Sequence, residues 1–264
     1  MLVACAESLR SAGTVEPKSL LEALAEHYEP ARGFGHGMKI ALTAFRSGTP
    51  WHRCAFAAWP EGSRGNGGAV RIPPVALVRW PDSASFDAAV RLATRVTHGH
   101  KEAIAFARVH AVAVATVLAD PAVVDTPRDF YGAVIERLDP APELVVAKFN
   151  TLCDLADRNA TRTEAGGVLG TSTLACESVP AALWSFVSQH KTFTESVCSA
   201  ALLGGDVDSI CCLVGSLAGA LHGSAAIEES WIRNLSHERP SPAEVLALAD
   251  ALTALVPLPL ATAG

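Results

Sequence analysis

The sequence predicts an all-α protein that folds as a single domain. Alanine is abundant, aromatic residues make up only 6% of the 264 residues, and alternating β-branched stretches are scarce. Apolar residues instead recur every three or four positions, which is the period of a helix with one buried face. Strands do not alternate with helices and no repeat is visible, so we expect a helical bundle rather than an α/β fold.

The first half of the chain carries several predicted helices with this spacing. They are residues 2–9, 20–28, 86–96 and 103–118. Asp82 and Ser83 precede the third of them and are good cap residues. The fourth is rich in alanine and valine and ends before Pro121, which cannot continue a helix.

The second half continues the pattern. Its predicted helices are residues 130–138, 143–158, 180–189, 194–203, 210–221 and 241–255. The last opens with Ser241-Pro242, a helix start with proline in the first turn. Breaks rich in glycine or proline lie at residues 33–37, 49–68, 73–74, 139–142 and 166–167. None is long, so we assign residues 1–256 to one domain and residues 257–264 to a loose tail.

Composition and charge narrow the class of protein. Half of the residues are hydrophobic and 18% are charged, which excludes a disordered chain. The net charge of −6 argues against a nucleic-acid-binding surface. The longest clean apolar run, residues 210–221, is too short to cross a bilayer, so no membrane partner is expected. Seven scattered cysteines without a CxxC pair, and no visible signal peptide at Met1, predict a cytoplasmic protein without disulfides.

The most informative motif is Gly204-Gly205-Asp206-Val207-Asp208-Ser209. In a loop, alternate side chains point the same way, so Asp206 and Asp208 can converge on one point. Two carboxylates followed by the hydroxyl of Ser209 are hard oxygen ligands, of the kind that Mg²⁺ or Ca²⁺ prefers. The same residues also suit the N-terminus of the following helix, where Asp and Ser act as caps.

A glycine-rich loop at residues 62–68 is the second candidate site. Its backbone N–H groups can line a hollow that suits a phosphate, and Arg64 and Arg71 add positive charge. The loop lacks the Lys-Ser/Thr pair of a P-loop. A flexible turn is the alternative interpretation.

His98 and Phe34 are further candidate ligand contacts. His98 lies between two predicted helices and can bind a phosphate or a ribose, or it can cap the helix that begins near Lys101. Phe34 lies in a glycine-dense turn and can stack on a ring, although a plain connection between helices also explains that turn.

Three glycines recur every four residues behind the aspartates, at Gly215, Gly219 and Gly223. In a soluble helix this spacing predicts a smooth face that lies close to a neighbouring helix. Such packing would hold the aspartate loop rigid.

The order of these motifs resembles that of the ADP-ribosylglycohydrolase family, also called ADP-ribosyl-acceptor hydrolases. The resemblance covers residues 1–235. It is carried by residues 32–35, 62–71, 97–98, 177–186 and 204–209. The stretches Glu-Ser-Val-Pro and Gly-Asn-Gly-Gly-Ala look most similar to the branch that removes ADP-ribose from serine and degrades poly(ADP-ribose).

The resemblance implies an all-α orthogonal bundle with two Mg²⁺ ions. By motif match, the metal ligands would be Asp206, Asp208 and Ser209. The ADP-ribose site would be lined by Gly62, Ser63, Arg64, Gly65 and Asn66, with His98 at the diphosphate and Phe34 near the ligand. The implied reaction is Mg²⁺-dependent hydrolysis of the glycosidic bond between ADP-ribose and an acceptor, either a protein serine or another ADP-ribose.

The family pattern also contains a catalytic glutamate and a Thr-Asp-Asp-Thr motif, and this sequence starts just after both. Three hypotheses follow: a hydrolase that is complete with an upstream segment, a catalytically inactive remnant that binds ADP-ribose, and a structural relative without a ligand. The sequence leaves the acceptor and the oligomeric state open. Without upstream partners, the first helix is expected to leave an apolar patch exposed around Leu2, Cys5 and Leu9.

Overall fold

The computed structural model describes residues 1–79, 83–235 and 240–256, and it confirms the all-α prediction. Within these ranges the only β-type pairing is an isolated bridge between Gly65 and Leu174. The tail predicted at residues 257–264 and the cap residue Asp82 lie outside the described residues.

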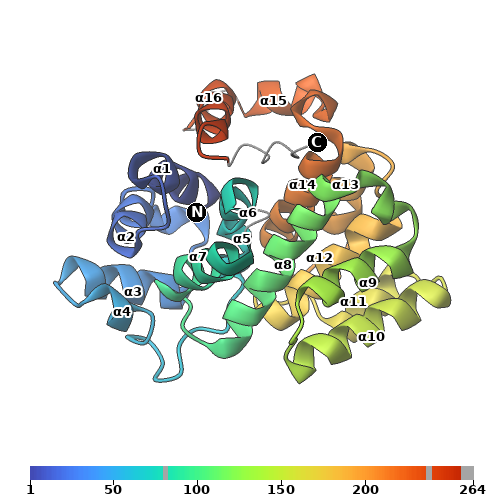
Figure 1. Cartoon of the computed structure of the whole chain (residues 1–264), viewed down its shortest axis with the longest axis horizontal. Coiled ribbons are helices and arrows are strands. Elements are labelled where there is room, and N and C mark those ends of the chain that lie inside the picture. Colours follow the sequence, from blue (N-terminus) through green and yellow to red (C-terminus); the bar gives the residue numbers. More distant parts are fainter. Residues whose placement is uncertain (80–82, 236–239, 257–264) are drawn as a thin grey trace, which may run out of the picture.

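The helix α8 (Lys101–Ala119) lies at the centre of the molecule and crosses the middle of Figure 1. Nearly all of its side chains between Ala103 and Val117 are buried. Helices from both halves of the chain pack against it. They are α5 (Gly67–Arg71), α6 (Pro73–Arg79), α7 (Ser83–Arg95), α9 (Pro127–Arg137), α12 (Ala175–Ser188) and α14 (Val207–His222).

In length and hydropathy α8 also matches a membrane span, and it is the one helix of the described residues that does. Two thirds of the apolar window, 67%, is buried inside this protein. The longest clean apolar run of the sequence, residues 210–221, lies in α14 instead. Because its apolar side chains are already covered by protein, α8 is explained as a core helix.

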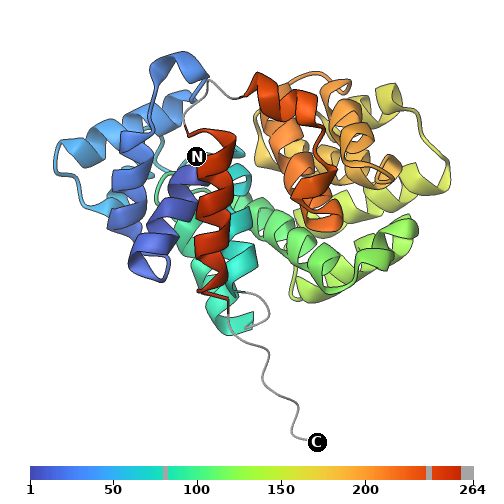
Figure 2. The same cartoon turned by 90° about the horizontal axis from the view of Figure 1, so that it is seen from above.

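On one side of α8 lie the N-terminal helices and the C-terminal one. They are α1 (Leu2–Ala12), α2 (Pro17–Glu26), α3 (His36–Arg46), α4 (Trp51–Cys54) and α16 (Pro242–Thr253). Figures 1 and 2 show α1 and α16 side by side, so the two ends of the described chain meet. The other side holds α10 (Glu143–Asp157), α11 (Arg162–Leu169), α13 (Phe193–Ala201) and α15 (Glu229–Asn234). Short 3-10 turns lie at Pro30–Arg32, Pro121–Asp125 and Ser224–Ala226.

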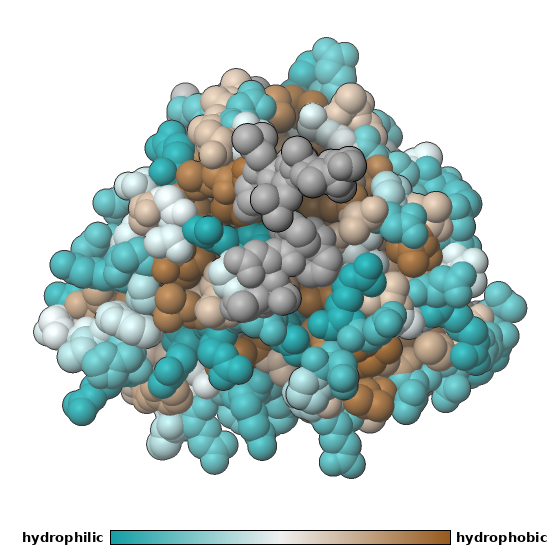
Figure 3. All heavy atoms as spheres, in the orientation of Figure 1, coloured by the Kyte–Doolittle hydropathy of each residue, from teal (hydrophilic) through white to brown (hydrophobic). Residues whose placement is uncertain are grey.

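The expected apolar patch at α1 is not found. Leu2 is half-buried, and Cys5 and Leu9 are each only 1% exposed, because α2, α6 and α16 pack around α1. The exposed apolar side chains near it belong to the covering helices instead, at Leu77 of α6 and Leu246 of α16. Figure 3 shows that, on the face it presents, apolar residues form small groups among polar ones.

Two predicted breaks are helical. Pro73-Pro74 opens α6, where proline fits because the first helical residues need no N–H partner. Gly166-Gly167 lies inside α11. A capping box between Thr161 and Glu164 stabilises the N-terminus of this helix. The helix α3 begins inside the glycine-dense turn that the sequence analysis treated as a break.

The three spaced glycines of α14 do not form the predicted contact face. A Cβ placed on Gly219 would meet no atom within 4 Å, and one on Gly215 would only just reach Val197 at 4.0 Å. Gly223 has a φ of 75° and follows the last residue of the helix. Its role is to end α14, because the left-handed region costs a glycine little.

The packing of α1 can be tested by truncation. Leu9→Ala is expected to lower the free energy of unfolding by about 2–5 kcal/mol, because it opens a cavity among α1, α2 and α16. The exposed neighbour Arg10→Ala is the control and should stay within about 0.5 kcal/mol. Urea denaturation measures both, and equal effects would contradict the packed α1.

Candidate functional site

Three loops meet beside α5 and the N-terminal ends of α12 and α14. They are residues 62–66, 170–174 and 204–209, here called the three-loop cluster. The first two are joined by the isolated antiparallel bridge, at which the Asn66 N–H donates to the Thr173 carbonyl at 2.9 Å. In the second bond of this bridge, the Ala175 N–H donates to the Arg64 carbonyl at 3.0 Å.

Asn66 ties the first loop to α12 and to the third loop through its side chain. The amide is only 6% exposed. Its Nδ2 donates to the Ser178 hydroxyl at 3.1 Å and to the Asp206 Oδ2 at 2.6 Å. Since Nδ2 carries two hydrogens, both are used. The glycine-rich loop and the aspartate motif, 140 residues apart in sequence, are therefore in direct contact.

The second and third loops approach so closely that glycine is required. Gly205 has a φ of 70°, and a Cβ there would lie 2.1 Å from the Thr171 carbonyl oxygen. The same carbonyl accepts the Asp206 N–H at 2.7 Å. This bond fixes the backbone from which the Asp206 side chain reaches Asn66.

Asp206 and Asp208 are neighbours at the start of α14, as the sequence analysis expected. Asp206 caps the helix and is half-buried, whereas Asp208 is exposed in the first turn. Burial raises the pKa of Asp206 above its ordinary value, and the nearby Asp208 adds to the rise. Hydrogen bonds from Asn66 and Ser209 to Asp206 oppose it. The two carboxylates thus concentrate negative charge, which a bound cation or hydrogen-bond donors would stabilise.

His98 faces the glycine-rich loop. Its Nε2 would lie 3.3 Å from a Cβ on Gly65 and 3.0 Å from one on Gly67. Its Nδ1 lies 2.8 Å from the Thr97 hydroxyl. Burial lowers the pKa of His98 to about 3, and the Arg71 charge adds to the lowering, so the imidazole is neutral at physiological pH.

Arg71 favours one tautomer of His98. Its guanidinium, which can only donate, lies 2.8 Å from the Thr97 hydroxyl. Thr97 therefore accepts from Arg71 and is free to donate its own hydrogen to Nδ1 of His98. In that arrangement the proton of His98 is on Nε2, the nitrogen that faces the loop. This tautomer makes His98 a hydrogen-bond donor to any group held by that loop.

Arg71 itself is not the positive charge at the loop that the sequence suggested. It is fully buried and donates to the carbonyl groups of Gly67, Ala93 and Thr94. Those of Ala93 and Thr94 belong to the last turn of α7, where a cation is favoured. Burial lowers the pKa of Arg71 to about 10, so it remains charged at neutral pH.

The Arg64 side chain is also engaged by a partner within the protein. Its Nε donates to Glu102 Oε2 at 2.9 Å, which ties the glycine-rich loop to the first turn of α8. Ser63 stabilises the loop from within, since its hydroxyl accepts the Gly65 N–H at 3.2 Å. Gly62 has a φ of 84°, and a Cβ there would lie 2.6 Å from the His100 backbone nitrogen. The loop thus rests directly on the backbone beside His98.

Phe34 is not joined to the three-loop cluster by any contact that the structure defines. Its ring packs on Tyr28, with centroids 5.1 Å apart, between α2 and α3. The capping role weighed for His98 belongs to His100, whose side chain accepts the Glu102 N–H at 3.2 Å. Sequence reasoning missed the tie to Glu102, because residues 38 positions apart show no shared pattern.

The cluster offers an incomplete set of metal ligands. Among the described residues, no three His, Cys, Asp or Glu side chains are grouped closely enough to hold an ion. Asp206, Asp208 and Ser209 provide two carboxylates and a hydroxyl, which fit one hydrated Mg²⁺ that takes its other ligands from water and substrate. They do not fit two neighbouring Mg²⁺ ions, whose charge two carboxylates would balance poorly.

Fold and site together define an all-α protein whose site lies in loops at helix N-termini, with a glycine-rich loop opposite paired aspartates. The family model of ADP-ribosylglycohydrolase matches residues 1–260. The chain belongs to the ADP-ribosylglycohydrolase family, whose members are glycosidases that act on ADP-ribosylated substrates.

Relatives and a solved structure agree with this assignment. The human ADP-ribosylhydrolase ARH3 is 26% identical over 263 residues, covering 88% of this chain and 71% of the human protein. An uncharacterised protein of Archaeoglobus fulgidus is 28% identical over 236 residues, covering 89% of this chain and 73% of its own length. A solved structure described as an ADP-ribosylglycohydrolase-related protein complex has a TM-score of 0.64 and 25% identity, covering 96% of this chain and 79% of that one.

The buried histidines predict that acid weakens the fold. Burial lowers the pKa of both His98 and His110 to about 3. As the pH falls below about 6.5, the unfolded chain binds protons that the folded chain does not. Stability should therefore fall by about 2 kcal/mol per histidine between neutral pH and pH 5.

Urea denaturation at the two pH values measures this loss. His110→Gln should reduce the pH dependence by about half, since one of the two buried histidines no longer titrates in the unfolded chain. The exposed His52→Asn is the control and should leave the dependence unchanged. The same pH dependence in His110→Gln and in the parent would contradict the assignment.

Proposed function

We propose that this chain binds ADP-ribose at the three-loop cluster and hydrolyses the bond between its anomeric carbon and an acceptor oxygen. The observation that carries the proposal is the hydrogen bond from Asn66 to Asp206, which brings the glycine-rich loop and the aspartates together. In the reaction, water adds to the anomeric carbon and the acceptor leaves with a proton.

His98 and the glycine-rich loop are the groups proposed to hold the diphosphate. The Nε2 proton of His98 points toward the loop, so it can donate to a phosphate oxygen without carrying a charge itself. Backbone N–H groups of the loop, freed by glycine, are further donors. The neutral histidine keeps this arrangement constant over the physiological pH range, because its pKa lies far below it.

Asp206, Asp208 and Ser209 are proposed to hold Mg²⁺ beside the ribose. When bound, such an ion supplies positive charge to the ribose hydroxyls. The raised pKa of Asp206 is consistent with the proposal, because burial and the adjacent Asp208 both disfavour its ionised form, which a bound cation would stabilise. Asn66 holds Asp206 in place and thereby positions the proposed ligand.

Poly(ADP-ribose) and ADP-ribosylated serine are the proposed substrates. A cavity of about 480 Å³ has Gly99 and Lys101 in its wall, and Gly99 packs against Gly62 of the loop. Arg91 and Arg95 line the same cavity, and Arg95 lies 5.9 Å from the centre of the Phe56 ring. In a chain of net charge −6, this group of cations suits the phosphates of a second ADP-ribose unit.

A second candidate function is binding of ADP-ribose without turnover. The presence of only two carboxylates in the aspartate motif favours it, because glycosidic hydrolysis generally needs a further group to handle the proton. In that case the loop and His98 would recognise ADP-ribose on a partner protein, and the cluster would serve as a binding site only.

The first test measures release of ADP-ribose from a serine-ADP-ribosylated peptide, with Mg²⁺ and with chelator. Release that needs Mg²⁺ is expected. Asn66→Ala should lower kcat/KM about 10- to 100-fold, because it removes a charge-assisted bond to Asp206. Asn234→Ala, at an exposed position of α15, is the control.

Calorimetry with free ADP-ribose separates the two candidates. Binding without release in any metal would favour the binding module over the enzyme. Absence of both binding and release would reject both functions.

The basic cavity gives a separate prediction. Exchanging Arg91 and Arg95 together for glutamine should raise KM for poly(ADP-ribose) several-fold and leave the serine peptide nearly unchanged, since only the polymer brings a second diphosphate. The control is Arg10→Gln, on the surface of α1. An equal effect on both substrates would place the two arginines in general substrate attraction rather than in recognition of the polymer.

A further inference from the structure

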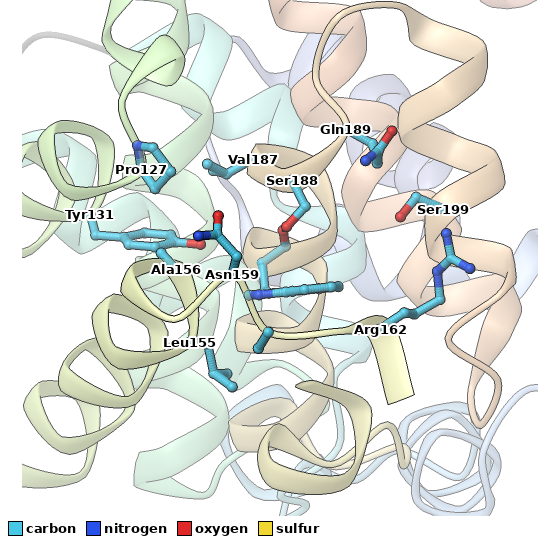
Figure 4. A pocket seen from close by; sticks show the side chains of 12 residues that line it. Pro127, Tyr131, Leu155, Ala156, Asn159, Arg162, Val187, Ser188, Gln189 and Ser199 are labelled. Carbon is cyan, nitrogen blue, oxygen red and sulfur yellow. The ribbon is translucent and has the colours of Figure 1, made fainter. Parts of the chain in front are cut away.

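A second cavity lies at the far end of α12 from the three-loop cluster. It has a volume of about 400 Å³ and is lined by residues of α9, α10, α12 and α13 and of the connection into α11. Figure 4 shows its labelled side chains arranged around the hollow. The helix α12 touches the cluster at Ala175 and this cavity at Ser188, a separation of about 20 Å along the helix.

Two polar groups of this cavity have a hydrogen that no group of the protein accepts. Tyr131 is 1% exposed and Trp184 is 6% exposed, and both line the cavity. No hydrogen bond of the described residues involves the tyrosine hydroxyl or the indole N–H. Both can therefore donate to an acceptor placed in the cavity.

Arg162 adds an unpaired charge. It is the first residue of α11, and its Nε is buried without a hydrogen-bond partner. No ion pair of the described part of the chain involves Arg162. The lining contains no aspartate or glutamate, so Arg162 is its one charged side chain.

Two side-chain amides, of Asn159 and Gln189, also line the cavity. Asn159 has a φ of 48°, in the left-handed region that asparagine tolerates better than most residues. Figure 4 shows Asn159 beside Tyr131, and Gln189 near Ser199 on the opposite side, toward which Arg162 extends. Neither amide has a side-chain partner among the described residues, so each can turn an N–H toward a ligand. Apolar side chains, among them Leu155 and Val187, line the remainder.

We propose that this cavity is a binding site for a small organic oxyanion, a carboxylate or a phosphate ester with a flat or aliphatic body. Its charged end meets Arg162 and the Gln189 amide, and its body lies against Trp184 and Leu155. The one charged side chain of the lining is a guanidinium, which suits both kinds of oxyanion. A neutral molecule of the same shape would leave the charge of Arg162 unpaired.

The test uses the indole N–H resonances of the five tryptophans in the full chain. Trp184→Phe identifies the Trp184 resonance. Benzoate, phenyl phosphate and neutral benzyl alcohol are then titrated. A saturable shift of the Trp184 resonance is expected with an anion and not with benzyl alcohol, and the tighter of the two anions identifies the acid group.

Arg162→Gln should weaken anion binding about tenfold, the loss of one charge-assisted bond, whereas Arg162→Lys should retain part of it. Arg10→Gln is the matched control and should bind normally. Unchanged positions of the other indole resonances show that each variant is folded. No saturable shift with either anion, an equal shift with benzyl alcohol, or undiminished binding by Arg162→Gln would overturn the proposal.

Discussion

The side chain of Asn66 is the contact on which the candidate site depends. Both of its amide hydrogens are used, one on Ser178 and one on Asp206, in a place nearly closed to solvent. A buried amide that loses a partner is costly, so the first turn of α12, which supplies Ser178, and the loop that supplies Asp206 are held to this one geometry. The glycine-rich loop, the start of α12 and the start of α14 therefore behave as a single unit.

Charge is distributed so that each part of this unit keeps a defined state. Arg71 is buried without a carboxylate and is satisfied by carbonyl groups and by Thr97, which in turn favours one tautomer of His98. The negative charge lies at Asp206 and Asp208, and burial raises the pKa of Asp206. A ligand with a diphosphate at one end and hydroxyls at the other matches this separation of donors from carboxylates.

Much of the fold could be predicted from helical spacing, because burial of one face leaves a period in the sequence. The predicted helices at residues 103–118 and 143–158 are observed within two residues as α8 and α10. The failures share one cause: Pro73 and Gly166 were treated as breakers, whereas their position in the helix, near the start or behind a capping box, makes them tolerable. Packing also reversed the expectation at α1, since α16, more than 200 residues later, covers it.

The sequence by itself determined the all-α class, the two motifs of the site and the membership of a family, because local periodicity and short motifs are written in neighbouring residues. Only the tertiary structure decided that Asn66 meets Asp206, that Arg64 is bound to Glu102 and that Arg71 is buried behind His98. It also decided that Tyr131, Trp184 and Arg162 share a cavity. Such contacts join positions far apart in the chain, and their energies depend on burial, which no local pattern records.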